Sequence, residues 1–220
     1  MIALAALDIA GTTVEEGGAV YRALHDAVRR HGSTAEVADV AHWMGADKRT
    51  AIRALLALGG DPSAVEKAFA DFERLLGEAY DANPPVAMPG VVEAFAGLRD
   101  HGAKVALTTG FSAEVTGLLL ERLGWQDGAV DAVVCTDDVP AGRPAPYMVH
   151  RAMERTGVLR TADVLTAGDT VLDLEAGSNA GAGIVVGVLS GGVPREVLAA
   201  APHTHLIPSV ASLPDVLAGI

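Results

Sequence analysis

The stretch Ile2-Ala3-Leu4-Ala5-Ala6-Leu7, followed at once by Asp8-Ile9-Ala10-Gly11-Thr12-Thr13, decides the fold of this 220-residue chain. Six consecutive apolar residues without alternation predict a strand that is buried on both faces, as the strands of parallel sheets are. The run ends in a carboxylate, and glycine and hydroxyl residues follow. Ligands of open α/β sheets bind beyond the carboxyl ends of the strands, so this segment predicts both the first core strand and part of a site.

Four later apolar runs have the same character: Lys104–Thr108, Val130–Cys135, Val164–Ala167 and Ile184–Leu189. Between them lie helical patterns with apolar residues three and four positions apart: Val91–His101, Ala113–Leu123, Pro146–Thr156 and Leu172–Ala180. This alternation of strands and helices predicts an α/β protein with a doubly wound, Rossmann-like parallel sheet.

Residues 16–85 depart from this alternation because they offer helical segments alone: Ala19–Arg30, Ala35–Trp43, Lys48–Leu58 and Ser63–Tyr80. Gly17-Gly18 on one side and Pro84-Pro85 on the other have the composition of hinges. We therefore expect a core made of residues 1–15 and 86–220, with residues 16–85 inserted as an all-helical cap that can close over the site.

Composition narrows the class of partner and the compartment. The net charge of −12 disfavours nucleic acid, because the overall field repels polyanions. The single cysteine, Cys135, leaves no internal disulfide and fits a reducing cytoplasm. The N-terminal apolar run is short and lacks a basic leader, and no run approaches the roughly 20 apolar residues that span a membrane. We expect a cytoplasmic protein that acts on a small molecule.

Polar residues follow each of four predicted strands, at the edge of the sheet where ligands bind. They are Asp8, the run Thr108-Thr109-Gly110, Arg143 beyond the third strand, and Asp169 with Asp173 beyond the fourth. Any one of them alone is more typical of a helix cap or a turn. Their order along the chain, with a helical insertion between the first two, is what favours a catalytic site.

This ordered set resembles the haloacid dehalogenase superfamily over essentially the whole chain. The resemblance implies that Asp8 attacks a phosphorus centre and becomes transiently phosphorylated. An anionic nucleophile needs a divalent cation to approach an anionic phosphoryl or phosphonyl group, and Mg²⁺ prefers oxygen ligands. The implied metal ligands are Asp8, Asp169, Asp173 and the main-chain carbonyl of Ala10. The implied contacts to the substrate are Gly11, Thr12, Thr109, Gly110 and Arg143.

Ala10 is unusual for that superfamily, whose phosphatases mostly carry a second aspartate at this position. That aspartate protonates the leaving group of a phosphate ester as a general acid. Without it, an ordinary ester has a poor leaving group. Cleavage of a carbon–phosphorus bond avoids this requirement when an iminium, formed between a lysine and a neighbouring aldehyde, accepts the electrons.

Lysine is scarce, since the chain has only Lys48, Lys67 and Lys104. We expect Lys104 at the end of its strand opposite the site and Lys67 inside a helix, which leaves Lys48. The segments Met44-Gly45-Ala46-Asp47-Lys48 and Thr136–Pro144 closely resemble the phosphonoacetaldehyde hydrolase (phosphonatase) family. The resemblance implies a Schiff base at Lys48, with Met44 at the substrate and a homodimer formed through the caps.

Two departures from that family leave the substrate open. Ala51 stands where the family has a histidine three residues after the lysine, and Phe111 stands where it has a tyrosine. The alternative enzyme is a phosphatase or phosphomutase that acts on a small phosphate ester. A receiver module and a metal-independent dehalogenase are further alternatives. A receiver module needs no cap, and its acidic ligands lie near the first strand, unlike Asp169 and Asp173 here.

Overall fold

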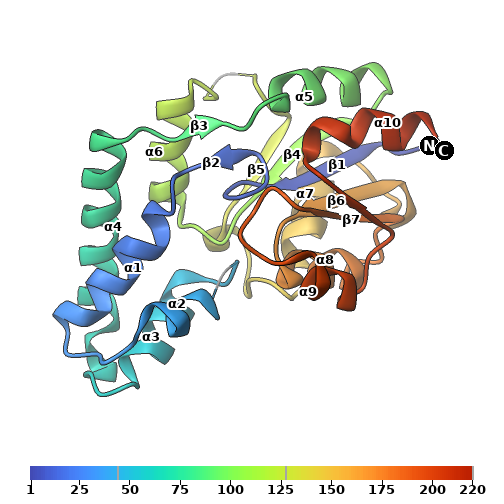
Figure 1. Cartoon of the computed structure of the whole chain (residues 1–220). Helices are drawn as coiled ribbons and strands as arrows, with labels where there is room; N and C mark the ends of the chain where they lie inside the picture. The colour runs from blue at the N-terminus through green and yellow to red at the C-terminus, as the bar shows by residue number, and fades with distance from the viewer. Residues whose placement is uncertain (44, 127, 220) are drawn as a thin grey trace.

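A computed structural model describes residues 1–43, 45–126 and 128–219 of the chain (Figure 1). It shows an α/β core that carries a helical unit on one side. Met44, predicted at the substrate, lies outside the described residues. None of the described helices has both the length and the apolar character of a membrane span.

The core is a six-stranded parallel sheet with the order β5-β4-β1-β6-β7-β8. The strands are β1 (Leu4–Asp8), β4 (Lys104–Thr108), β5 (Ala132–Val134), β6 (Val164–Gly168), β7 (Ile184–Val188) and β8 (His205–Ile207). From β1 the sheet grows first toward β4 and β5, and the chain then crosses to build β6 to β8 on the other side. The strand order therefore reverses at β1, which places Asp8 at the switch point where such sheets bind ligands.

Both faces of the sheet are covered, which explains the absence of alternation in its strands. Every residue of β1 is buried. Leu4 and Ala6 pack into one cluster with α7 (Tyr147–Thr156), while Ala5 and Leu7 pack into another with α5 (Val91–Asp100). The layer of α5 includes α6 (Ala113–Leu123) and α10 (Leu213–Ala218), and that of α7 includes α8 (Val171–Asn179) and α9 (Arg195–Ala200) (Figure 1).

The helical unit is inserted between two short strands that pair with each other. β2 (Val14–Glu15) is antiparallel to β3 (Val86–Ala87). The helices between them are α1 (Ala19–Arg30), α2 (Val37–Ala41), α3 (Lys48–Leu56) and α4 (Val65–Ala82), and α1 packs along α4 (Figure 1). The predicted domain limits fall at the ends of this two-stranded ladder, and we propose that the ladder is the hinge of a closing cap.

The predicted helices and strands agree with the structure to within two residues at each end. The predicted helix from Ser63 begins instead at Val65, because Pro62–Ala64 forms a 3₁₀ turn. Cys135, predicted in a strand, is buried one residue beyond β5. The prediction lacked β2, β3, β8, α9 and α10, which are all six residues or shorter and too brief to show a period.

Candidate active site

Asp8 ends β1 in the middle of the sheet, where Thr108 of β4 lies beside it in register. The carboxylate is buried, and its Oδ1 atom lies 2.7 Å from Nη1 of Arg143. Desolvation raises the pKa of Asp8 to about 7, and the positive charge of Arg143 opposes this rise. The position and the burial are those of a reacting carboxylate held away from bulk water.

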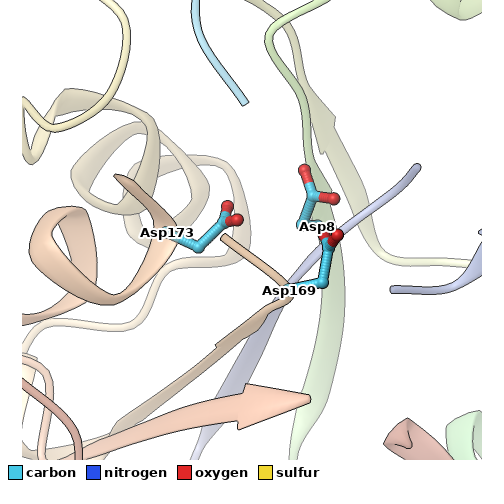
Figure 2. A group of neighbouring side chains, drawn as sticks. All are labelled: Asp8, Asp169 and Asp173. Atoms are coloured by element: carbon cyan, nitrogen blue, oxygen red, sulfur yellow. The ribbon is translucent and has the colours of Figure 1, made fainter. Parts of the chain in front are cut away.

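Two further carboxylates converge on Asp8 from the other side of the switch point (Figure 2). Asp169 follows β6, Asp173 lies in the first turn of α8, and ligand oxygens of all three residues lie within 4.8 Å of one another. The backbone N–H of Thr170 donates to Oδ2 of Asp173 at 3.0 Å, in a capping box that begins α8. The turn from β6 into α8 thus presents both carboxylates at the end of β1.

This acidic group fits a hard divalent cation. Its three carboxylates are buried, and Arg143 is the one cationic side chain of the described residues that pairs with them. Burial, followed by the charges of Asp8 and Asp173, raises the pKa of Asp169 well above its ordinary value. Clustered carboxylate oxygens with excess negative charge are the donor set that Mg²⁺ prefers. Ala10 lines the same space, so its carbonyl is available as a further oxygen.

Two glycines enclose the carboxylate of Asp169. A Cβ atom at Gly11, whose φ is 86°, would lie 2.4 Å from Oδ2 of Asp169, and one at Gly191 would lie 1.8 Å from it. Thr12 donates through Oγ1 to Oδ1 of Asp169 at 3.1 Å. Gly11 and Thr12, predicted at the substrate, therefore contact the acidic group. Gly191 was not predicted, because its place next to Asp169 depends on the fold.

Arg143 is held by three partners. Besides Asp8, its Nε atom lies 2.9 Å from Oδ1 of Asp173, and Nη2 donates to the carbonyl and hydroxyl oxygens of Thr108 at 3.0 and 2.7 Å. Its side chain is only 4% exposed. Thr108 was predicted at this edge of the sheet but was given no role of its own, which its two contacts to Arg143 now supply. The geometry fixes the guanidinium beside the carboxylate of Asp8.

Lys48 comes from the cap and reaches the same place. It is the first residue of α3, is 4% exposed, and donates from Nζ to the carbonyl of Ala46 at 2.7 Å. Nζ also lies 5.6 Å from the ring centroid of Phe111. Desolvation lowers the pKa of Lys48 to about 8, against the charges of Asp47 and Asp8, which raise it. An amine in this state is partly neutral near pH 7 and can act as a nucleophile.

These residues line a small chamber of about 20 Å³. The described residues that line it are Asp8, Ala10, Val20, Tyr21, Gly45, Lys48, Thr109, Gly110, Phe111, Arg143, Asp169 and Thr170. Val20 and Tyr21 of α1 were not predicted, because nothing in an amphipathic helix says which residues face a neighbouring domain. A space of this size holds about one water molecule, so the cap is closed over the core in this structure.

A larger cleft opens beside the chamber. It measures about 740 Å³ and lies between residues of the cap from His42 to Thr50 and residues of the core from Thr136 to Pro144, with Arg143 and Ala46 on its wall. Trp43 also lines this cleft. The cleft is wide enough for a small substrate, whereas the chamber in its closed form is not.

The fold and the site define a class of hydrolase. The family model of the haloacid dehalogenase-like hydrolases matches residues 2–181, so the chain belongs to this family. A phosphonoacetaldehyde hydrolase from Paraburkholderia phytofirmans is 31% identical over 217 residues, which cover 89% of this chain and 80% of that protein. For other curated relatives of that name, the match covers 51% of their length.

Solved structures agree on the fold. A phosphonoacetaldehyde hydrolase like protein from Oleispira antarctica superposes with a TM-score of 0.86 at 23% identity, covering 99% of this chain and 92% of that one. A hydrolase from Pseudomonas syringae gives 0.86 at 19% identity, with 99% of both chains covered. Structures assigned to phosphatases and phosphomutases share the fold at 17 to 20% identity. These likenesses show the fold alone.

Proposed function

We propose that this protein is a Mg²⁺-dependent hydrolase that cleaves the carbon–phosphorus bond of phosphonoacetaldehyde or of a close α-carbonyl phosphonate. The observation that carries the proposal is the buried amine of Lys48, which lines one chamber with Asp8. The 31% identity to a phosphonoacetaldehyde hydrolase supports it.

The residue at position 10 also favours this reaction over ester hydrolysis. Ala10 lines the chamber but offers no side-chain proton for a departing alkoxide. Among the described residues, the acidic side chains of the chamber are Asp8 and Asp169. Asp8 is the proposed nucleophile and Asp169 a proposed ligand of the cation, so neither is left to protonate a leaving group. A reaction in which Lys48 takes up the leaving electrons removes the need for an acid at this position.

In the first step, the neutral amine of Lys48 adds to the aldehyde carbon, and the resulting carbinolamine loses water to give an iminium. The lowered pKa of Lys48, about 8, supplies the neutral amine. The benzene ring of Phe111 beside Nζ can stabilise the positive charge of the iminium, as it does that of the ammonium.

In the second step, a carboxylate oxygen of Asp8 attacks phosphorus. The carbon–phosphorus bond breaks, and its electron pair moves onto carbon to form an enamine on Lys48, while Asp8 becomes an aspartyl phosphate. Arg143, Thr109 and Gly110 would hold the phosphorus-bound oxygens, since all three line the chamber. Protonation of the enamine carbon and addition of water then release acetaldehyde from Lys48, and a second water releases phosphate from Asp8.

Asp8, Asp169, Asp173 and the carbonyl of Ala10 would hold Mg²⁺. The ion would supply screening of negative charge between the carboxylate and the phosphonyl group. The protein's part is to exclude bulk water by burial and to fix the carboxylates, through Thr12 for Asp169 and through Thr170 for Asp173.

The proposal is tested by product analysis. The purified protein is incubated with phosphonoacetaldehyde and Mg²⁺, and acetaldehyde and phosphate are measured together. We expect equal amounts of both, no turnover by Lys48→Arg, and normal turnover by Lys67→Arg, which alters an exposed residue of α4. Hydrolysis of small phosphate esters by wild type and Lys48→Arg alike, with no acetaldehyde formed, would instead establish the phosphatase alternative.

A further inference from the structure

Asp47, the residue before Lys48, contacts both the cap and the core. Its Oδ1 atom accepts a hydrogen bond from the backbone N–H of Thr50 at 2.8 Å, which caps the N-terminus of α3. Its Oδ2 atom accepts from the hydroxyl of Thr136 at 3.0 Å, and Thr136 belongs to the core. One carboxylate thus ties the start of α3, where Lys48 lies, to the far side of the cleft.

The rest of segment 45–48 approaches the core without such a bond. A Cβ atom at Gly110 would lie 2.9 Å from the carbonyl oxygen of Ala46, and one at Gly45 would lie 2.6 Å from the hydroxyl of Thr170. Within the described parts of the chain, the hydrogen bond from Thr136 to Asp47 is the one that joins this segment to the core. It is therefore a directional contact that holds the start of α3, where Lys48 lies, against the core.

This contact must break when the chamber opens. The chamber of about 20 Å³ is too small for any phosphonate, so substrate arrives only when the cap and core separate. Asp47 and Thr136 both line the 740 Å³ cleft between cap and core, so their hydrogen bond crosses the interface that has to part.

We propose that Asp47 is a positioning residue whose hydrogen bond to Thr136 latches the cap shut and holds the amine of Lys48 in the chamber. The proposal rests on the proposed function for the chemical role of Lys48. The latch itself is a property of the closed structure, and it holds whatever the substrate is.

The test measures how often Lys48 is exposed to a small reagent. The whole protein is treated with acetaldehyde and cyanoborohydride without any phosphonate, and peptide mass mapping follows alkylation of Lys48 over time. Lys67 and Lys104 in the same sample serve as internal references. Thr136→Val removes the latch donor and keeps the shape, and Asp47→Ser keeps a capping oxygen for α3 but is too short to reach Thr136. Labelling is compared at pH 9.5, where the Lys48 amine is neutral in every variant, because loss of the Asp47 charge by itself lowers the pKa of Lys48.

We expect each variant to speed the labelling of Lys48 by about 2- to 10-fold relative to Lys67, the range that one net hydrogen bond supports. The double variant should label Lys48 no faster than either single variant, because both changes break the same bond. Thr136→Ser keeps the hydroxyl donor and should therefore label at the wild-type rate. Unchanged labelling in both single variants, or additive effects in the double variant, would overturn the latch. Since no phosphonate is used, failure of the proposed function would leave this result intact.

Discussion

Replacing Lys48 by methionine should stabilise the protein at pH 7 while removing its proposed chemistry. Desolvation lowers the pKa of Lys48 from its ordinary value of 10.5 to about 8. That difference corresponds to about 3 kcal/mol by which folding disfavours the protonated amine. Lys48→Met fills a similar volume without a charge, so its free energy of unfolding at pH 7 should exceed that of wild type by up to about 3 kcal/mol.

The gain should depend on pH in one direction. The folded pKa lies below the unfolded one, so between pH 8 and pH 10.5 the unfolded chain binds more protons than the folded protein. The stability of wild type relative to Lys48→Met therefore rises across this window. Below pH 8 the amine is protonated in both states, and the cost of its burial is fully present.

Urea unfolding of both proteins from pH 6.5 to 10 measures this directly. Lys67→Met, a change on the exposed side of α4, is the matched control and should alter stability by no more than a few tenths of a kcal/mol at any pH. Destabilisation by Lys48→Met at pH 7, or a difference that stays constant through the window, would refute the desolvated amine. The nucleophilic role of Lys48 would then lose its physical basis.

Three further predictions concern the core side of the site. Gly191→Ala should weaken Mg²⁺ binding at least tenfold in a calorimetric titration, because its Cβ would displace the carboxylate of Asp169, while Gly117→Ala, which meets nothing within 4 Å, should bind normally. Arg143→Lys should lower kcat/KM by about 100-fold or more, because an ammonium cannot contact Asp8, Asp173 and Thr108 at once as the guanidinium does; retention of activity would argue against a fixed guanidinium. Asp8→Asn should give no phosphoenzyme by mass spectrometry, and a phosphorylated variant would remove the nucleophile assignment.

The sequence predicted the layers of the fold because the long elements carry their own period. β1 and β4 show unbroken apolar runs, and both faces of each are covered by helices, so pattern and burial agree. The two-residue strands β2 and β3 have no such pattern, since their pairing depends on the whole insertion returning to its start. Long-range pairing of short segments leaves no local signal.

The site residues also divide into those with a local sequence signal and those placed by long-range packing. Asp8, Asp169 and Arg143 could be proposed because each follows a recognisable strand, and parallel strands end at one edge of a sheet. Lys48 lies in the same chamber because the cap folds over the core. The spacing of residues along the chain carries no information about that arrangement. Tyr21 and Gly191 reach the site by packing alone, one from α1 and the other from the loop after β7.

Lys48 should form a Schiff base during cleavage of the carbon–phosphorus bond, and borohydride trapping detects that intermediate itself. The protein is mixed with phosphonoacetaldehyde and Mg²⁺, reduced during turnover, digested and mapped by mass. We predict loss of activity together with an ethyl group on Lys48. This group is the reduced two-carbon fragment that remains on the amine after the carbon–phosphorus bond has broken. Full turnover to acetaldehyde and phosphate with Lys48 unmodified would contradict this prediction.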